Sequence, residues 1–186
     1  IKSNGYDREV LEKSGLFGYS NSEFFDRFRS RIMFPIWNSS SKIVGFGGRV
    51  FASEDPAKYM NSPETPLYKK SDIFYGLHNA RNAIRKNGYA ILVEGYTDVI
   101  QLYQNGIQNC VAVSGTAFSE RHVNQMKRFC SKALLAYDGD SAGISATLKT
   151  GYNLIKGGIE AQVIEIPNKL DPDEWVSNEG TDAFIK

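Results

Sequence analysis

The sequence predicts an α/β protein, with an open and mostly parallel sheet in its C-terminal half and a smaller mixed α+β region before it. From residue 89 onward, short apolar runs alternate with segments of helical periodicity, which is typical of parallel strands joined by crossover helices. The charge also reverses along the chain: residues 1–88 hold 14 basic and 9 acidic side chains, whereas residues 89–186 hold 8 and 12. These patterns together divide the chain into domains at residues 1–86 and 87–186.

The composition is that of an ordinary globular protein. Of the 186 residues, 41% are hydrophobic and 23% are charged, which excludes a disordered, collagen-like or coiled-coil chain. No run approaches the roughly 18 apolar residues of a membrane span and no signal peptide opens the chain, so we expect a cytoplasmic protein without membrane contact. Because the chain begins at Ile1, we expect it to be part of a longer protein. Cys110 and Cys130 fit neither a disulfide framework nor a zinc site and are expected to be buried free thiols.

Each element of the C-terminal half is bounded by residues that start or stop regular structure. The first apolar run lies between Gly88 and Gly95, Ser119 is a good helix N-cap, and Gly157 and Gly158 close the longest helical segment. Strands are expected at residues 89–94, 110–114, 133–137 and 162–166. Helices are expected at residues 98–105, from 119, at 142–156 and after 171.

The N-terminal half mixes helix, strand and loop. Residues 1–23 are expected to be helical and then loop-like. Residues 33–37 and 43–51 are extended runs joined by a polar segment, which indicates a β-hairpin. Residues 55–66 contain three prolines and are expected to form a long ordered loop, whereas residues 73–86 have the periodicity of a helix that leads into the C-terminal half.

Acidic side chains follow three of the predicted strands. Glu94 ends the first strand, Asp138 and Asp140 follow the third, and Asp171 and Asp173 follow the fourth. Because the carboxyl ends of parallel strands meet at one edge of a sheet, these carboxylates should lie close together and repel one another unless a cation intervenes. A single aspartate after a strand is more often a helix N-cap. Three acidic groups at one edge instead predict a divalent metal site, whose oxygen ligands favour Mg²⁺ or Mn²⁺ over Zn²⁺.

Basic groups and glycines in the N-terminal half suit a polyanionic ligand. Three arginines would share one face of an extended segment: Arg27, Arg29 and Arg31. Residues 45–49 (GFGGR) resemble a phosphate cradle with Arg49 as a bidentate donor, although such a cluster is more often a bulge or a site of close sheet packing. Lysines follow at Lys58, Lys69 and Lys70. Together with the acidic edge, these features predict a polyanion laid across a metal centre that performs phosphoryl chemistry.

The acidic motifs resemble those of the TOPRIM domain, which is shared by bacterial primases, type IA and type II topoisomerases and some nucleases. The resemblance lies in residues 94–98 (EGYTD), 138–143 (DGDSAG) and 171–174 (DPDE). Three upstream segments resemble the basic subdomain that precedes TOPRIM in bacterial DnaG-type primases: residues 26–36 (DRFRSRIMFPI), 45–49 (GFGGR) and 58–65 (KYMNSPET). The resemblance extends from about Tyr6 to Lys186 and implies a Rossmann-like TOPRIM sheet.

The resemblance implies a DNA-directed RNA polymerase that makes short primers by two-metal nucleotidyl transfer. Glu94 corresponds to the glutamate that acts as a metal ligand or as a general acid/base, and Asp98 to a secondary acidic residue. The pair Asp138 and Asp140 corresponds to metal ligands. Asp171 and Asp173 match the third acidic motif. Basic residues that touch the template or the incoming nucleotide correspond to Arg29, Arg49, Lys58 and Lys70.

The family also implies cofactors and partners. We expect two or more Mg²⁺ or Mn²⁺ ions, a single-stranded DNA template and ribonucleoside triphosphates. The zinc-binding and helicase-binding domains of the family have no counterpart in these residues, so we expect no zinc in this fragment. Contacts with the replicative helicase and the single-strand-binding protein are then expected through other regions, at a bacterial or phage replication fork.

Three other functions use the same features. A TOPRIM nuclease would hydrolyse DNA with the same carboxylates, but the primase-like upstream segments argue against it. A topoisomerase fragment would need a tyrosine nucleophile from elsewhere, because Tyr96 and Tyr137 are expected only to pack or form hydrogen bonds. A non-catalytic binding module would gain nothing from acidic groups beside phosphates. We expect structural roles for His78 and His122, and a simple turn at residues 115–116.

Overall fold

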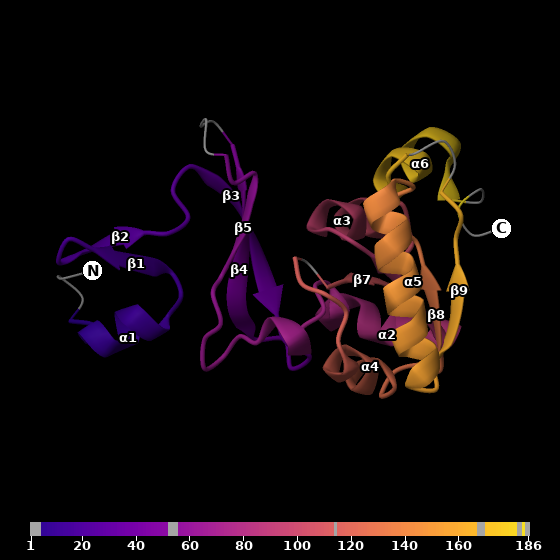
Figure 1. Cartoon of the computed structure of the whole chain (residues 1–186), viewed down its shortest axis with the longest axis horizontal. Coiled ribbons are helices and arrows are strands. Elements are labelled where there is room, and N and C mark those ends of the chain that lie inside the picture. The colour runs from indigo at the N-terminus through magenta and orange to yellow at the C-terminus, as the bar shows by residue number, and fades with distance from the viewer. Residues whose placement is uncertain (1–4, 52–55, 114, 167–169, 182–183, 185–186) are drawn as a thin grey trace. The chain divides into compact units, whose positions relative to one another are not determined.

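The structure is a computed structural model that describes residues 5–51, 56–113, 115–166, 170–181 and 184. Residues 55 and 114, at the ends of two predicted elements, lie outside this set. The chain forms two compact units, which Figure 1 shows. The first contains the chain up to Trp37 together with Lys42–Lys69, and the second contains Asn38–Ser41 together with Lys70–Lys186. The division into domains at residues 86 and 87 stays a prediction.

The first unit is built from one short helix and five antiparallel strands. Its elements are α1 (Arg8–Lys13), β1 (Phe17–Ser20), β2 (Glu23–Asp26), β3 (Arg31–Trp37), β4 (Ile43–Val50) and β5 (Tyr59–Asn61). β1 and β2 form a two-stranded sheet, and the second sheet has the order β3-β4-β5. The predicted hairpin is confirmed, since β3 pairs with β4 from Arg31↔Val50 to Trp37↔Ile43. A register shift between Ile36 and Trp37 bends this hairpin near its turn.

Four expectations for the first unit are wrong. Residues 17–26 are a hairpin rather than a loop, and β5 lies inside the predicted loop 55–66. Residues 27–30 form a turn that ends at Ser30 with φ 54°, so the three arginines do not share the face of one extended segment. The glycine cluster lies within β4 and is not a cradle loop.

The glycines of β4 instead allow close packing, which is the alternative interpretation. A Cβ at Gly45 would lie 3.0 Å from the ring of Tyr68, and one at Gly48 would lie 2.9 Å from the ring of Phe28. A larger residue at either glycine would therefore collide with one of these rings.

The second unit alternates strands and helices in the order that the sequence predicts. Its elements are the 3₁₀ turn η2 (Lys70–Asp72), α2 (Leu77–Asn87), β6 (Tyr89–Val93), α3 (Tyr96–Gln104), β7 (Cys110–Ala112), α4 (Glu120–Met126), β8 (Lys132–Leu135), α5 (Ser141–Lys156), β9 (Glu160–Val163) and α6 (Pro172–Glu179). All four strands are parallel, in the order β7-β6-β8-β9. The α/β class is thus confirmed. β9 begins earlier than expected, because the chain leaves α5 through Gly158 with φ 79° and pairs at once with β8.

Helices cover both faces of this sheet. Alternate residues of β6 point to opposite sides: Ala90 and Leu92 join a core with α2, α4 and α5, whereas Ile91 and Val93 join a second core with α3 and α6. In Figure 1, α5 lies in front of the sheet of the second unit. Because both faces are covered, β6 reads in the sequence as an unbroken apolar run. None of the helices in the described part of the chain combines the length and apolar character that a membrane span requires.

The first turn of α5 lies unusually close to the end of β8. A Cβ at Gly143 would come within 2.1 Å of the carbonyl oxygen of Asp138, so only glycine fits at this position. We therefore expect Gly143→Ala to lower the free energy of unfolding by about 1–3 kcal/mol, as overpacking does.

Gly151, two turns further along the same helix, provides the matched control. Its Cβ would make an ordinary 3.5 Å contact with Leu135, so Gly151→Ala should raise the free energy of unfolding by about 0.5–1 kcal/mol. Urea unfolding of both variants tests the pair. Stabilisation by both substitutions would show that α5 does not approach Asp138 closely.

Candidate active site

The predicted acidic residues lie at the carboxyl ends of the strands, where the connections after β6 and β8 turn toward opposite faces of the sheet. After β6 the chain passes into α3 on one face, and after β8 it passes into α5 on the other. β6 and β8 are neighbours, so their carboxyl ends form the crevice in which α/β sheets bind ligands. Glu94 follows β6 and Asp138 follows β8. The backbone N–H of Asp138 donates to Oε1 of Glu94 at 3.3 Å, which joins the two predicted site residues directly.

The other predicted carboxylates lie at helix N-termini. Asp140 is the N-cap of α5, and its Oδ1 accepts from the Gly143 N–H at 2.7 Å. Asp98, in the first turn of α3, accepts from the Gly95 N–H at 2.8 Å. Asp171 is the N-cap of α6 and Asp173 lies in its first turn. The N-cap role therefore coexists with the acidic site, because helix N-termini stabilise nearby negative charge.

Burial and nearby carboxylates raise the pKa values of Asp138, Asp98 and Glu94. Burial raises the pKa of Asp138 from 3.8 to about 7, with further contributions from Glu94, Asp171, Asp98 and Asp140. Burial likewise raises the pKa of Asp98 to about 6, against the hydrogen bond from Gly95. The pKa of Glu94 is raised by burial and by the charges of Asp140 and Asp171. Burial and repulsion by the neighbouring carboxylates therefore both disfavour the ionised form of these three groups.

The donor set suits a hard divalent cation, which would relieve this repulsion. The available groups are carboxylate oxygens, the ligands that Mg²⁺ and Mn²⁺ prefer. Among the residues that the structure describes, however, no three carboxylate, imidazole or thiol side chains come together closely enough to hold one ion. The predicted ligand set of Glu94, Asp138, Asp140, Asp171 and Asp173 is not assembled as one group, so metal binding stays a prediction.

The four predicted basic residues fall in both units. Arg29 is exposed in the turn after β2, with its guanidinium 5.8 Å from the ring of Phe25. Arg49 lies on β4, with its guanidinium 5.5 Å from the ring of Tyr59, and Lys58 is exposed just before β5. Lys70 begins η2 in the second unit. Their roles toward nucleic acid stay predictions.

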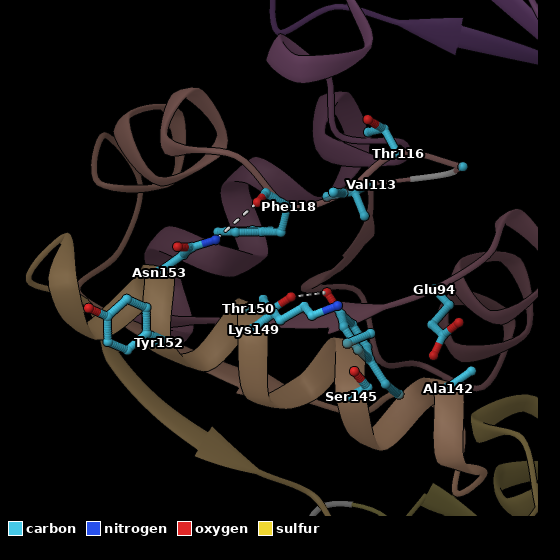
Figure 2. A pocket seen from close by; sticks show the side chains of 14 residues that line it. Glu94, Val113, Thr116, Phe118, Ala142, Ser145, Lys149, Thr150, Tyr152 and Asn153 are labelled. Carbon is cyan, nitrogen blue, oxygen red and sulfur yellow. Dashed lines mark hydrogen bonds between the residues drawn. The ribbon is translucent and has the colours of Figure 1, made fainter.

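A cavity of about 830 Å³ lies beside Glu94, on the side of the sheet covered by α5. Figure 2 shows its lining side chains, which come from the segment after β7, from Tyr137 and from α5. Thr116, expected only in a turn, lines this cavity, as does Lys149. The spacing of Ala142, Ser145, Ala146 and Lys149 on one helix face was the available sequence signal for this feature.

The contacts of His122, Tyr96 and Tyr137 are those of structural residues. His122 is buried: its Nδ1 accepts from the Ser119 N–H at 3.1 Å, and its Nε2 lies 3.1 Å from the carbonyl oxygen of Lys70, to which it donates. Burial lowers the pKa of His122, which keeps the ring neutral. The hydroxyl of Tyr137 lies 3.4 Å from that of Thr150, and Tyr96 packs edge-on against Tyr75.

The cysteines are free, as predicted. Cys110 is fully buried, but Cys130 is only partly buried.

Comparison with known proteins now places both units. A family model for the DNA primase catalytic core, N-terminal domain, matches residues 1–81, and a Toprim-like model matches residues 91–176. The chain belongs to the DnaG-type primase catalytic cores. The two matches follow one another in the order that the sequence predicts, with the primase N-terminal region first and the Toprim-like region second.

Relatives of this primase core match it along nearly its whole length. DNA primase of Staphylococcus aureus (strain COL) is 43% identical over 186 residues, which are 99% of this chain and 31% of that protein. A DNA primase domain from Pseudomonas aeruginosa is 40% identical with a TM-score of 0.89, over 97% of this chain and 59% of that one. A DnaG primase catalytic domain bound to single-stranded DNA is 36% identical with a TM-score of 0.86, over 99% of this chain and 60% of that one. The primase core described here thus spans about a third of the length of the S. aureus primase.

Asp138 should make the stability of the fold depend on pH. Because its pKa is higher in the folded chain than its ordinary value of 3.8, the folded state binds more protons between about pH 4 and 7, and stability falls as the pH rises through this window. Asp138→Asn removes the ionisable group. We expect its Tm to exceed the parent's at about pH 8 in EDTA and to match it at about pH 4.

Circular dichroism melts across this pH range measure the effect, with Asp72→Asn as the control. Asp72 is an acidic residue of the same unit that forms a 3.1 Å ion pair with Arg121 instead of facing other carboxylates. Its replacement should give no gain at high pH. A pH-independent difference for Asp138→Asn would contradict the repulsion described above.

Proposed function

We propose that this chain performs template-directed synthesis of short RNA primers on single-stranded DNA. The observation that carries the proposal is the hydrogen-bonded pair of Glu94 and Asp138 at the crevice of a Toprim-like sheet, within electrostatic range of Asp98, Asp140 and Asp171. Membership of the primase cores supports this reaction over the other chemistries of Toprim-like sheets. Contacts with a replicative helicase and a single-strand-binding protein at a replication fork would fall to other parts of the longer relatives.

The reaction joins two ribonucleotides. The 3′-oxygen of one bonds to the α-phosphorus of the next, the bond between the α-phosphorus and its bridging oxygen to the β-phosphate breaks, and pyrophosphate leaves. The proton of the 3′-hydroxyl must pass to a base. Glu94 suits this role, because burial and the neighbouring charges raise the pKa of its carboxyl group and so make the carboxylate a stronger base.

The carboxylates would also hold Mg²⁺ or Mn²⁺ ions. Glu94, Asp138 and Asp140 are the proposed ligands at the end of β6 and β8, and Asp171 and Asp173 at the start of α6. A bound divalent ion supplies Lewis acidity for the attacking hydroxyl and for the leaving phosphates. Asp98 holds the backbone of Gly95 and so positions the turn that carries Glu94.

Basic residues would hold the template and the nucleotide phosphates. Arg29 and Lys58 are exposed cations, and Arg49 keeps its planar guanidinium over the Tyr59 ring, which leaves its N–H groups for a phosphate. Lys70 begins η2 in the other unit. The single-stranded DNA bound to a related primase catalytic domain supports a template of this kind.

Asp140→Asn tests the acidic site without disturbing the fold. Asparagine caps helices as well as aspartate does, so the side-chain oxygen can still accept from Gly143. We expect RNA synthesis to fall by about 100-fold or more, because a carboxylate charge at the reacting phosphates is lost, while the Tm stays close to the parent value. The measurement is incorporation of labelled ribonucleotides on single-stranded DNA with Mn²⁺.

Asp72→Asn again provides the control and should leave synthesis unchanged, since Asp72 pairs with Arg121 on the surface. Full activity of Asp140→Asn would remove this residue from the site. Shortening of the DNA without RNA synthesis would instead favour a nuclease.

Arg49→Ala tests phosphate binding by the first unit. Each phosphate contact to a single strand contributes about 0.7 to the slope of log affinity against log salt, so we expect this slope to become shallower by about 0.7. Fluorescence anisotropy of labelled single-stranded DNA at several salt concentrations measures it. Lys13→Ala removes one charge from a lysine that already pairs with Glu9 and should leave the slope unchanged. An equal slope for the Arg49 variant and the parent would exclude the contact.

A further inference from the structure

The cavity beside Glu94 is kept open by small side chains. Ala142, Ser145 and Ala146 lie on one face of α5, where spacings of three and four residues align them along the helix. Larger residues at these positions would fill the space between α5 and the segment after β7. Figure 2 shows Ala142 and Ser145 along one wall, with Glu94 at one end of the cavity.

Two hydrogen bonds hold the walls together. Nδ2 of Asn153, on α5, donates to the carbonyl oxygen of Phe118 at 3.1 Å, and the hydroxyls of Tyr137 and Thr150 lie 3.4 Å apart. Phe118 is itself buried against Phe74 and His122. The cavity is therefore preformed, and its volume of about 830 Å³ falls in the range of small-molecule sites.

Lys149 places a cation in the wall of the cavity, between Glu94 and Tyr152. Apart from Glu94, it is the one charged side chain in the lining. Among the described residues, Lys149 has no ion pair or hydrogen bond, although acidic side chains lie at the start of its helix. It follows Asp140 by nine residues, which corresponds to about 13 Å along the helix axis. A ligand that contacts both Lys149 and the carboxylate site must carry an anionic group for the lysine and a group that suits the carboxylates.

We propose that this cavity holds the ribose and the 5′-triphosphate of the initiating ribonucleotide, with Lys149 as the cationic contact of its phosphates. The inference rests on the proposed primase function. An incoming nucleotide presents its own triphosphate to the acidic edge. The initiating nucleotide presents its 3′-hydroxyl there instead, and its 5′-phosphates point away from the carboxylates. A cation further along α5 than the carboxylates fits this second orientation.

The lining suits the remaining parts of this ligand. The ribose lies along Ala142 and Ser145, where the small side chains leave room and the serine hydroxyl faces a polar sugar edge. The Thr116 hydroxyl lies on the facing wall. The base points out of the cavity, where it can pair with the template.

Dinucleotide synthesis with separated substrates tests the proposal on this chain. The initiating nucleotide is GTP or GMP, and the second nucleotide is a 3′-deoxynucleoside triphosphate, which can be added but cannot initiate. The parent should show a KM for GTP about tenfold below that for GMP, because Lys149 makes charge-assisted contacts with the terminal phosphates. Lys149→Ala should lose this preference and keep the KM for GMP. Lys156→Ala, on the same helix but outside the cavity, should retain the preference.

A second pair of variants tests the space and not the charge. Ser145→Phe fills the cavity and should raise the KM for GTP and GMP alike, by about tenfold or more. Leu148→Phe enlarges an exposed side chain of α5 that is not part of the lining and should change neither. Unchanged constants in Ser145→Phe, or an intact triphosphate preference in Lys149→Ala, would overturn the proposal.

Two further readouts separate this inference from the proposed function. Extension of an annealed RNA oligonucleotide reports polymerisation without an initiating triphosphate. If Lys149→Ala extends this primer and also keeps the parent's preference for GTP over GMP, the cavity site is refuted while the proposed primase function stands. Titration with GTP, followed by the backbone NMR signals of Ala117 and Ala146, reports binding without turnover. Shifts in the parent that Lys149→Ala abolishes would support the site even if no primer were made. No shift in the parent would overturn it.

Discussion

The parallel pairing of β6 with β8 is the constraint on which the site depends. It brings Glu94 and the backbone of Asp138 within 3.3 Å, although 44 residues separate them in sequence. The strands leave the sheet toward opposite faces, so no helix fills the space beyond their carboxyl ends. The close approach of Gly143 to Asp138 then sets where α5 begins, and with it the position of Asp140 and of one wall of the cavity.

The acidic residues illustrate how one group can serve the fold and the chemistry together. Asp140 and Asp98 both accept hydrogen bonds from backbone N–H groups at the start of a helix, which stabilises their charge. Among the described residues, no hydrogen bond to the Asp138 carboxylate compensates its charge in this way, and its pKa rises from 3.8 to about 7. Asp138 is therefore the site carboxylate at which burial and repulsion are least offset, close to where the reacting groups are proposed to meet.

Much of this arrangement could be predicted from the sequence, because it follows from short-range rules. Apolar runs gave the order of the strands of the second unit, and the topology of parallel sheets then placed Glu94 and Asp138 at one edge. The errors arose where distant contacts decide the outcome. The glycines of β4 are small because Tyr68 and Phe28 occupy the space beside them, and Ser30 adopts a positive φ that serine does not favour. In the sequence, Lys149 cannot be told from any surface lysine. Its place in the wall of the cavity depends on the contact between Asn153 and Phe118, which are 35 residues apart.

The bond from His122 to the backbone of Lys70 links a core residue to a surface cation. His122 is neutral and buried, and its two ring nitrogens join the start of α4 to η2. The backbone of Lys70 is therefore anchored to the core before any ligand arrives. When its ammonium group meets a phosphate, the conformational entropy that is lost belongs to the lysine side chain alone, since the main chain has already been ordered during folding. A histidine with no part in the chemistry would thus lower the entropic cost of the proposed contact between Lys70 and a nucleic acid.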